Sequence, residues 1–166
     1  LCLDKTGTLT QGKMQVEKVY PTEPWRSIPF EELMGSFLQH SDDTNATFQA
    51  LKARFEANTT FSPVRKIPFS SERKWSAMEF ENAGTFVIGA PERLGGTIPP
   101  HLQKEEQEGK RILLAGLAKG AVESNRPLPA IQEFAYMVIS DPIRPNAAET
   151  LAYFQKEGVD LKLISG

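Results

Sequence analysis

The sequence has few of the residue types that cross-link small proteins or bind metals in them. It contains one cysteine and two histidines among 166 residues. Cys2 cannot form an internal disulfide, and because it lies in a short apolar run we expect a buried thiol. His40 and His101 are far apart and have no cysteine or acidic cluster at ligand spacing, so we predict no zinc site.

Long apolar runs and an excess of charge are also missing. No hydrophobic stretch approaches the length of about 20 residues that a membrane-spanning helix needs. The formal net charge of -2 gives the whole chain no general attraction for nucleic acid. The glycine-rich phosphate loop Gly-x4-Gly-Lys-Ser/Thr is absent as well. Any bound nucleotide must therefore be held by stacking and by scattered cations, and we expect its affinity to be modest.

The middle of the chain has the hydrophobic pattern of an antiparallel sheet with helices. Residues 64–88 contain three successive strand-like segments, with a hairpin turn at residues 81–84 between the last two. Further strands are expected at residues 14–20, 111–120 and 133–140. Helices are expected at residues 30–39, 41–58 and 101–110, and we expect the second helix to be capped by Asp42, Asp43 or Thr44.

The two ends of the chain have a different pattern, in which strands run into turns of small or reactive residues. Residues 1–4 and 159–166 are such strands, and an amphipathic helix precedes the second one. Ligands bind at the carboxyl ends of strands in open parallel sheets. We therefore expect an α/β fold in which residues 1–13 and 139–166 form one partial domain. Residues 14–138 would be an inserted domain, an antiparallel β-sheet flanked by helices.

The last residue stands at the mouth of a loop, where a helix covering the final strand would be expected to follow. We therefore expect this chain to be a monomeric fragment of a larger protein.

Asp4 stands where the first strand ends, and a turn of threonine and glycine follows it directly. A carboxylate in this position can act as a nucleophile toward phosphate, because the turn lets backbone N–H groups approach phosphoryl oxygens. Mg²⁺ would neutralise the negative charge between the carboxylate and the phosphate.

Residues 4–10, DKTGTLT, resemble the phosphorylation signature of P-type ATPases, which are members of the haloacid dehalogenase superfamily. The resemblance implies that Asp4 is the phosphorylated nucleophile and that Lys5, Thr6, Gly7 and Thr8 complete the catalytic loop. It also implies an incomplete Mg²⁺ site at Asp4 and Thr6. Phosphatases of the superfamily carry a second aspartate at the position of Thr6, as a general acid/base. Because such help is worth roughly 10²–10⁴ in rate, a phosphate on Asp4 should be hydrolysed slowly.

Two further motifs resemble parts of the same family outside the inserted domain. Residues 141–145, DPIRP, are similar to the hinge motif, which implies that Asp141 and Arg144 lie where the inserted domain rejoins the first one. The alternative is a proline-rigid linker with an exposed ion pair. Residues 163–166, LISG, are similar to the start of a Thr-Gly-Asp motif, so Ser165 and Gly166 are expected to contact phosphate, with serine in place of threonine.

The inserted domain resembles the nucleotide-binding domain of these pumps. In PFSSERK the likeness implies that Phe69 stacks on adenine and that Lys74 faces the nucleotide, although Phe69 in the core is the alternative. In VIGAPE, Gly89 and Ala90 are expected to leave room for the adenine, and Ile88 stands where many members have lysine.

Two more nucleotide contacts are taken from the same resemblance. Arg111 is expected to reach the phosphates, with an exposed arginine at a strand start as the alternative. Residues 43–47 lie where relatives have a helix-start motif near the adenine but do not match the acidic residue that some members use. From this segment we take only Asn45.

The resemblance implies a function. The chain would be the ATP-binding, cytoplasmic part of a P-type ATPase in the bacterial plasma membrane, an enzyme that uses ATP and Mg²⁺ to move a cation through an aspartyl phosphate. Its implied partners are ATP and the transmembrane and actuator domains of the same parent chain, with the cation bound elsewhere and no nucleic acid. His40 is followed by Ser41 and not by proline, which disfavours heavy-metal exporters, and the compact insertion is most similar to calcium-exporting pumps.

The isolated fragment is expected to lack a complete catalytic site. Two alternatives remain open, a soluble phosphatase of the dehalogenase superfamily with a cap insertion and a non-catalytic nucleotide-binding module.

Overall fold

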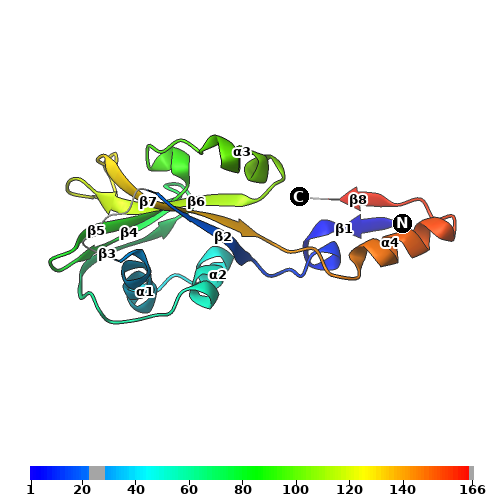
Figure 1. Ribbon diagram of the computed structural model, residues 1–166, viewed down its shortest axis with the longest axis horizontal. Helices are drawn as coiled ribbons and strands as arrows, with labels where there is room; N and C mark the ends of the chain where they lie inside the picture. The colour runs from blue at the N-terminus through cyan, green and yellow to red at the C-terminus, as the bar shows by residue number, and fades with distance from the viewer. Residues whose placement is uncertain (23–28, 165–166) are drawn as a thin grey trace.

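Two β-sheets organise the chain in the computed structural model, which describes residues 1–22 and 29–164 (Figure 1). Within these residues, a six-stranded antiparallel sheet has the order β2-β7-β6-β5-β4-β3, and β1 pairs in parallel with β8. The strands are β1 (Cys2–Asp4), β2 (Gln15–Pro21), β3 (Pro63–Ser70), β4 (Trp75–Phe80), β5 (Gly84–Gly89), β6 (Arg111–Ala118), β7 (Ile131–Ser140) and β8 (Lys162–Ile164).

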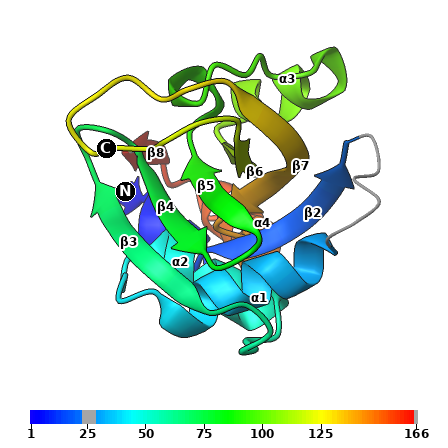
Figure 2. The same cartoon turned by 90° about the vertical axis from the view of Figure 1, so that its left-hand side faces the viewer.

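The helices cover both faces of the larger sheet. Figure 2 shows α1 and α2 together on one face and α3 on the opposite face, and Figure 1 shows α4 beside the β1–β8 pair. The helices are α1 (Phe30–His40), α2 (Ala46–Arg54), α3 (Pro100–Gln107) and α4 (Ala147–Lys156). The residues described contain no helix with both the length and the apolar character needed to cross a membrane.

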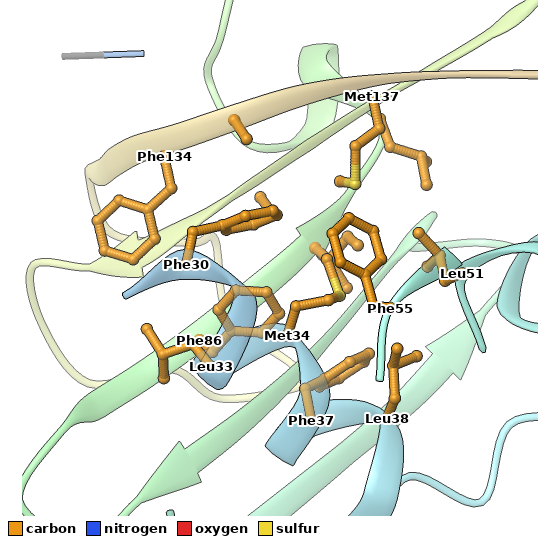
Figure 3. Close-up of a cluster of buried hydrophobic side chains, with 14 of the residues drawn as sticks. Phe30, Leu33, Met34, Phe37, Leu38, Leu51, Phe55, Phe86, Phe134 and Met137 are labelled. Carbon is orange, nitrogen blue, oxygen red and sulfur yellow. The ribbon is translucent and has the colours of Figure 1, made fainter. Parts of the chain in front are cut away.

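Side chains along the central strands point alternately to the two faces of the six-stranded sheet, so each face has its own hydrophobic core. On β4 and β5, Met78 and Phe86 face α1 and α2, whereas Ala77 and Val87 face the side of α3. The spacing of apolar residues in α1 turns a continuous stripe toward the sheet, where it meets Phe134 (Figure 3). Labelled members of this core are Phe30, Leu33, Met34, Phe37, Leu38, Leu51, Phe55, Phe86, Phe134 and Met137.

The two segments that join the sheets run side by side. Gln15 pairs with Ser140 where β2 begins and β7 ends, and a single bridge joins Thr10 to Ile143. The six-stranded unit therefore begins and ends at neighbouring positions. These positions lie close to residues 14 and 138, where the sequence predicts the ends of an inserted domain.

The structure corrects two expectations from the sequence. Helix α2 begins at Ala46 and is capped by Asn45, whose side chain accepts a 2.9 Å hydrogen bond from the Phe48 N–H, and not by Asp42, Asp43 or Thr44. Cys2 is exposed and not buried, because β1 has only β8 as a strand neighbour among the described residues.

Candidate functional site

Asp4 lies at the carboxyl end of β1, beside the end of β8. The parallel register pairs Asp4 with Ile164, so both strands deliver their following loops to the same edge. Asp4 is exposed, and within the described residues no hydrogen bond or ion pair holds its carboxylate. Ser165 and Gly166, predicted to contact phosphate from the β8 side, lie outside the described residues.

The loop after Asp4 begins with a type II turn. Thr6 has φ -77° and ψ 121°, and Gly7 has φ 80° and ψ -11°, which are the dihedral angles of the two central residues of that turn. A Cβ atom on Gly7 would meet nothing within 4 Å, so glycine is needed for its left-handed backbone and not for space. The turn exposes Lys5, Thr6 and Thr8 around the carboxylate.

Asp141 and Arg144 hold this loop from the far end of the chain. The Asp141 carboxylate accepts hydrogen bonds from the Thr10 hydroxyl at 2.6 Å and the Lys13 N–H at 3.2 Å. The Arg144 guanidinium donates to the carbonyl oxygens of Gly7, at 2.9 Å, and Thr10, at 3.0 Å. Within the described residues Asp141 and Arg144 form no ion pair with each other, so the alternative of a linker with an exposed ion pair is not what the geometry gives.

Thr10 is a site residue that the sequence analysis missed. It is 2% exposed, and its hydroxyl oxygen also accepts a 3.1 Å hydrogen bond from the Gly7 N–H. A threonine at the end of a polar loop gives no local sign of burial. The signal available was its place at the end of the DKTGTLT segment, opposite the Asp-Pro-x-Arg segment that resembles the hinge.

A cavity of about 520 Å³ lies at the end of the six-stranded sheet, between the start of α2 and the ends of β4, β5 and β6. Its wall includes every residue that the sequence analysis assigned to nucleotide binding. These residues are Asn45, Phe69, Lys74, Ile88, Gly89, Ala90 and Arg111. Their common position is an observation, and their role in binding a nucleotide stays a prediction.

Phe69 presents its ring at the mouth of this cavity. Its side chain is 43% exposed, unlike the buried phenylalanines of the core, so the alternative in which Phe69 is a core residue is wrong. Asp43 fixes the backbone here, because its carboxylate accepts a 3.3 Å hydrogen bond from the Phe69 N–H. Asp43 also lines the cavity and is an acidic residue that the sequence analysis did not assign to the site.

Lys74 has a left-handed backbone, with φ 61°, in the turn that joins β3 to β4. For a residue with a side chain this conformation costs about 1–2 kcal/mol, so the surrounding structure must hold it. The Lys74 N–H donates to the Ser70 carbonyl at 2.7 Å, and the Lys74 carbonyl accepts from the Ala90 N–H at 3.0 Å. The two hydrogen bonds fix the backbone position of Lys74, and so the point from which its side chain extends along the wall of the cavity.

Gly89 is also needed for the close approach of the neighbouring strand, while its role beside the adenine stays a prediction. A Cβ atom on Gly89 would lie 2.4 Å from the Lys74 carbonyl oxygen and 2.5 Å from the Trp75 Cβ. The space that this glycine leaves is therefore filled by strand β4 of the protein itself. Gly89 lets the two strands approach closely and so helps to set the position of Lys74.

Arg111 is the first residue of β6 and lies across the cavity from the β4–β5 end. It is exposed, and its guanidinium donates a hydrogen bond to the Thr47 hydroxyl on α2. This bond explains how an arginine at a strand start is turned toward the cavity. The neighbouring Lys110 also lines the cavity.

Lys110 belongs to a network of charged groups that joins β2, α3 and β6. Its ammonium lies 2.6 Å from Glu105, 3.0 Å from Glu17 and 3.6 Å from Glu108, and Glu105 also pairs with Lys18 at 2.7 Å. Hydrogen bonds from Lys110 and Lys18 lower the pKa of Glu105 to about 2. The hydrogen bond to Glu105 is the main cause that raises the pKa of Lys110, which is therefore cationic at neutral pH.

The loop that carries Asp4 lies near this charged end of the cavity. A Cβ atom on Gly109, in the turn between α3 and Lys110, would be 4.0 Å from the Lys5 ammonium nitrogen. The Lys5 side chain therefore extends from the Asp4 loop to the turn next to Lys110 and Arg111. This arrangement places the Asp4 loop beside the cationic end of the cavity, with the Lys5 side chain between them.

The described residues supply few ligands for a metal ion. They contain no group of three or more His, Cys, Asp or Glu side chains that could hold one. The free carboxylate of Asp4 is the hard oxygen ligand that Mg²⁺ prefers, and Mg²⁺ at phosphate sites commonly takes one or two carboxylates, substrate oxygens and water. The donor set fits an ion shared with a bound phosphate, and a role for Thr6 beside Asp4 stays a prediction.

The chain is similar to parts of known proteins over its full length. Residues 1–166 match the model of the haloacid dehalogenase-like hydrolase family. A probable cation-transporting ATPase, exp7, of Streptococcus pneumoniae is 44% identical over 100% of this chain and 22% of its own length. The calcium-transporting ATPase CtpE of Mycobacterium tuberculosis is 31% identical over 100% of this chain and 21% of its own. The chain thus spans about a fifth of these relatives.

A solved structure of a zinc-transporting PIB-type ATPase shares the fold. It superimposes with a TM-score of 0.57 and 20% sequence identity, over 99% of this chain and 24% of the other. At this identity the likeness concerns the fold alone.

Proposed function

Because the chain belongs to the haloacid dehalogenase-like hydrolase family, we propose that it is the ATP-binding and phosphate-accepting segment of a P-type cation pump. One observation carries the proposal. Residues predicted separately as nucleotide contacts line a single cavity, and the Lys5 side chain joins its cationic end to the loop of Asp4. The similarity to cation-transporting ATPases along the whole chain supports the same function.

We assign nucleotide binding to the part of the chain with the larger sheet and phosphate acceptance to the part with the smaller one. Residues 14–138 form the nucleotide-binding domain, and residues 1–13 and 139–166 form the part of the phosphorylation domain that carries the acceptor. The hydrogen bonds of Asp141 and Arg144 to the Asp4 loop support a role for them at the junction.

ATP binding in this cavity needs a surface for the base and cations for the phosphates. Phe69 offers an exposed ring for stacking, and the buried side chain of Ile88 offers apolar surface in the same cavity. Lys74, Lys110 and Arg111 supply positive charge, and the last two lie toward Lys5. The triphosphate would therefore extend from the base site toward the Asp4 loop.

The proposed chemical step is transfer of the γ-phosphoryl group to Asp4. A carboxylate oxygen of Asp4 forms a bond to phosphorus, the bond from phosphorus to the β–γ bridging oxygen breaks, and ADP leaves with that oxygen. Mg²⁺, when bound, would neutralise charge on the phosphate oxygens. Thr6 cannot act as a carboxylate base for water, which favours a phosphoenzyme that lasts long enough to be coupled to a conformational change.

For the cation we propose calcium. The relative that is 31% identical is named as calcium-transporting, and the one that is 44% identical is named only as cation-transporting. The ion would bind in a membrane domain of the parent protein, with an actuator domain as a further partner, and this segment would face the cytoplasm.

The proposal is tested in two steps. Calorimetric titration of the 166-residue chain with ATP should give a measurable affinity, and no binding at millimolar ATP would contradict an intact nucleotide site. The protein containing this segment should take up label from γ-labelled but not α-labelled ATP, and Asp4→Asn should abolish that uptake. Hydrolysis of p-nitrophenyl phosphate by the 166-residue chain would instead favour a phosphatase.

A further inference from the structure

Two carboxylates outside the nucleotide cavity hold the ammonium group of Lys110. Of the described residues Lys110, Glu17 on β2 and Glu105 on α3, only Lys110 lines the cavity. The Lys110 nitrogen lies 3.0 Å from Glu17 Oε2 and 2.6 Å from Glu105 Oε2. The three side chains are 24%, 32% and 13% exposed, respectively. Because these charges are partly shielded from water, their attraction is stronger than that of a fully exposed ion pair.

A β-bulge in β2 turns Glu17 toward Lys110. Val16 and Lys18 lie opposite consecutive residues of β7, so Glu17 is an extra residue on its strand. In a regular strand, successive side chains point to opposite faces of the sheet. Here Val16 packs in the core beside α1 and α2, whereas Lys18 reaches Glu105 on α3 and Glu17 reaches the residue that follows the turn after α3. The bulge therefore lets two successive charged residues serve the same face.

The ammonium of Lys110 keeps a donor for a ligand. It has three N–H groups, and Glu17 and Glu105 accept from two of them. Glu108 lies 3.6 Å away, outside hydrogen-bond distance. Ordering a free lysine side chain costs rotamer entropy, and a phosphate that meets an ammonium already in place does not bear that cost.

We propose that Glu17 is a positioning residue that holds the Lys110 ammonium in the cavity wall for the triphosphate. This inference rests on the proposed function, in which Lys110 is one of the cations for the phosphates. Glu17 acts through Lys110 and does not touch the nucleotide. An effect of its charge alone would have the opposite sign, because a negative group beside the cation weakens the attraction for phosphate. Loss of Glu17 therefore distinguishes the two roles.

The test compares ATP with adenosine, which has the base and no phosphates, on the 166-residue chain. Binding is measured by displacement of a fluorescent ATP analogue. Glu17→Ala should weaken ATP binding by about 2- to 10-fold, since the ammonium must then be ordered by the ligand, and should leave adenosine binding unchanged. Glu17→Gln keeps an oxygen acceptor at the same place and should retain at least half of the affinity for ATP.

Glu108 provides a matched control, because its carboxylate has the same charge and lies near the same ammonium without a hydrogen bond to it. Glu108→Ala should not weaken ATP binding. A second control removes the ammonium itself. Lys110→Met should weaken ATP binding, and adding Glu17→Ala to it should have no further effect, because no cation is left to hold.

The inference is overturned if Glu17→Ala leaves ATP binding unchanged or strengthens it, or if it weakens ATP and adenosine binding equally. It is also overturned if Glu17→Ala weakens ATP binding as much in the Lys110→Met chain as in the wild type. A wild-type chain that binds no nucleotide overturns the proposed function itself, which separates the two failures.

Discussion

The hydroxyl of Thr10 donates a 2.6 Å hydrogen bond to the carboxylate of Asp141, a residue 131 positions later in the chain. Thr10 closes the loop that follows Asp4, and Asp141 begins the segment that follows β7. The bond therefore ties the predicted phosphate acceptor to the point where the chain leaves the six-stranded sheet. A second tie lies beside it, because Arg144 donates to the carbonyl oxygens of Gly7 and Thr10.

Replacing Thr10 with valine should destabilise the fold, because the shape is kept and the hydroxyl is lost. The Gly7 N–H then lacks a partner, and the Asp141 carboxylate keeps only the hydrogen bond from the Lys13 N–H, in a partly buried setting. We expect the free energy of unfolding in urea to fall by about 1–3 kcal/mol. Thr10→Ser, which keeps the hydroxyl, should lose less, and a valine variant as stable as the wild type would contradict the assigned role.

Phe69→Ala should separate nucleotide binding from stability. The ring is 43% exposed, so its loss should change the free energy of unfolding by less than about 1 kcal/mol. Stacking of a base on an aromatic ring is worth about 1–3 kcal/mol, so calorimetry should find ATP binding at least about fivefold weaker. Val64→Ala is the control on the same strand, since Val64 is 63% exposed and does not line the cavity. Equal effects of the two variants would argue against stacking.

Gly89→Ala should disturb the packing of β5 against β4. The added Cβ would lie 2.4 Å from the Lys74 carbonyl oxygen and 2.7 Å from the Trp75 Cα, and backbone atoms cannot move aside as a side chain can. Overpacking of this kind costs about 1–3 kcal/mol, and the shift of Lys74 should also weaken ATP binding. Gly95→Ala is the comparison, because a Cβ there meets nothing within 4 Å and only its left-handed φ of 74° opposes the change. Gly95→Ala should therefore leave ATP binding unchanged.

The charged network around Glu105 predicts how stability depends on pH. Hydrogen bonds from Lys110 and Lys18 lower the pKa of Glu105 from its ordinary value near 4.5 to about 2 in the folded state. The ionised carboxylate therefore stabilises the fold above pH 4.5, and this contribution is lost as the pH falls from 4.5 toward 2.

Urea unfolding between pH 5 and pH 2 should consequently show a smaller loss of stability in Glu105→Gln than in the wild type. Molar salt should reduce the difference, since the network is partly open to solvent. Glu149→Gln on α4 is the control, because Glu149 has no ion pair within the described residues. A wild-type pH profile that matches that of Glu105→Gln would contradict the assigned pairing.

The sequence was sufficient to predict the elements whose signals are local. The β3–β4–β5 meander follows from alternation and from the turn at residues 81–84, and α1 follows from apolar spacing and α3 from its polar run ending in glycine. The sequence predicted that the two ends of the chain belong to one domain, and the structure pairs their strands β1 and β8 in parallel. Residues assigned to the cavity from separate motifs line one wall, because the antiparallel register aligns the strand ends that carry them.

What the sequence did not reveal depends on contacts between distant residues. Asn45 caps α2, whereas Asp43, one of the predicted caps, accepts a hydrogen bond from the Phe69 N–H on β3, a contact between distant residues that the sequence does not show. The role of Gly89 depends on how closely Trp75 approaches on the next strand. The exposure of Cys2 depends on how many strands pair with β1.

The pairing of Gln15 with Ser140 has a consequence for how the chain can be divided into separate segments by protein engineering. A segment whose entrance and exit touch can be excised, or exchanged for another, by splicing two adjacent ends without stretching what remains. Joining residue 13 to residue 141 through a short flexible bridge should leave β1, α4 and β8 in register. Residues 14–140 would form a separable module, and such a module could be exchanged between related proteins without redesign of the part that receives it.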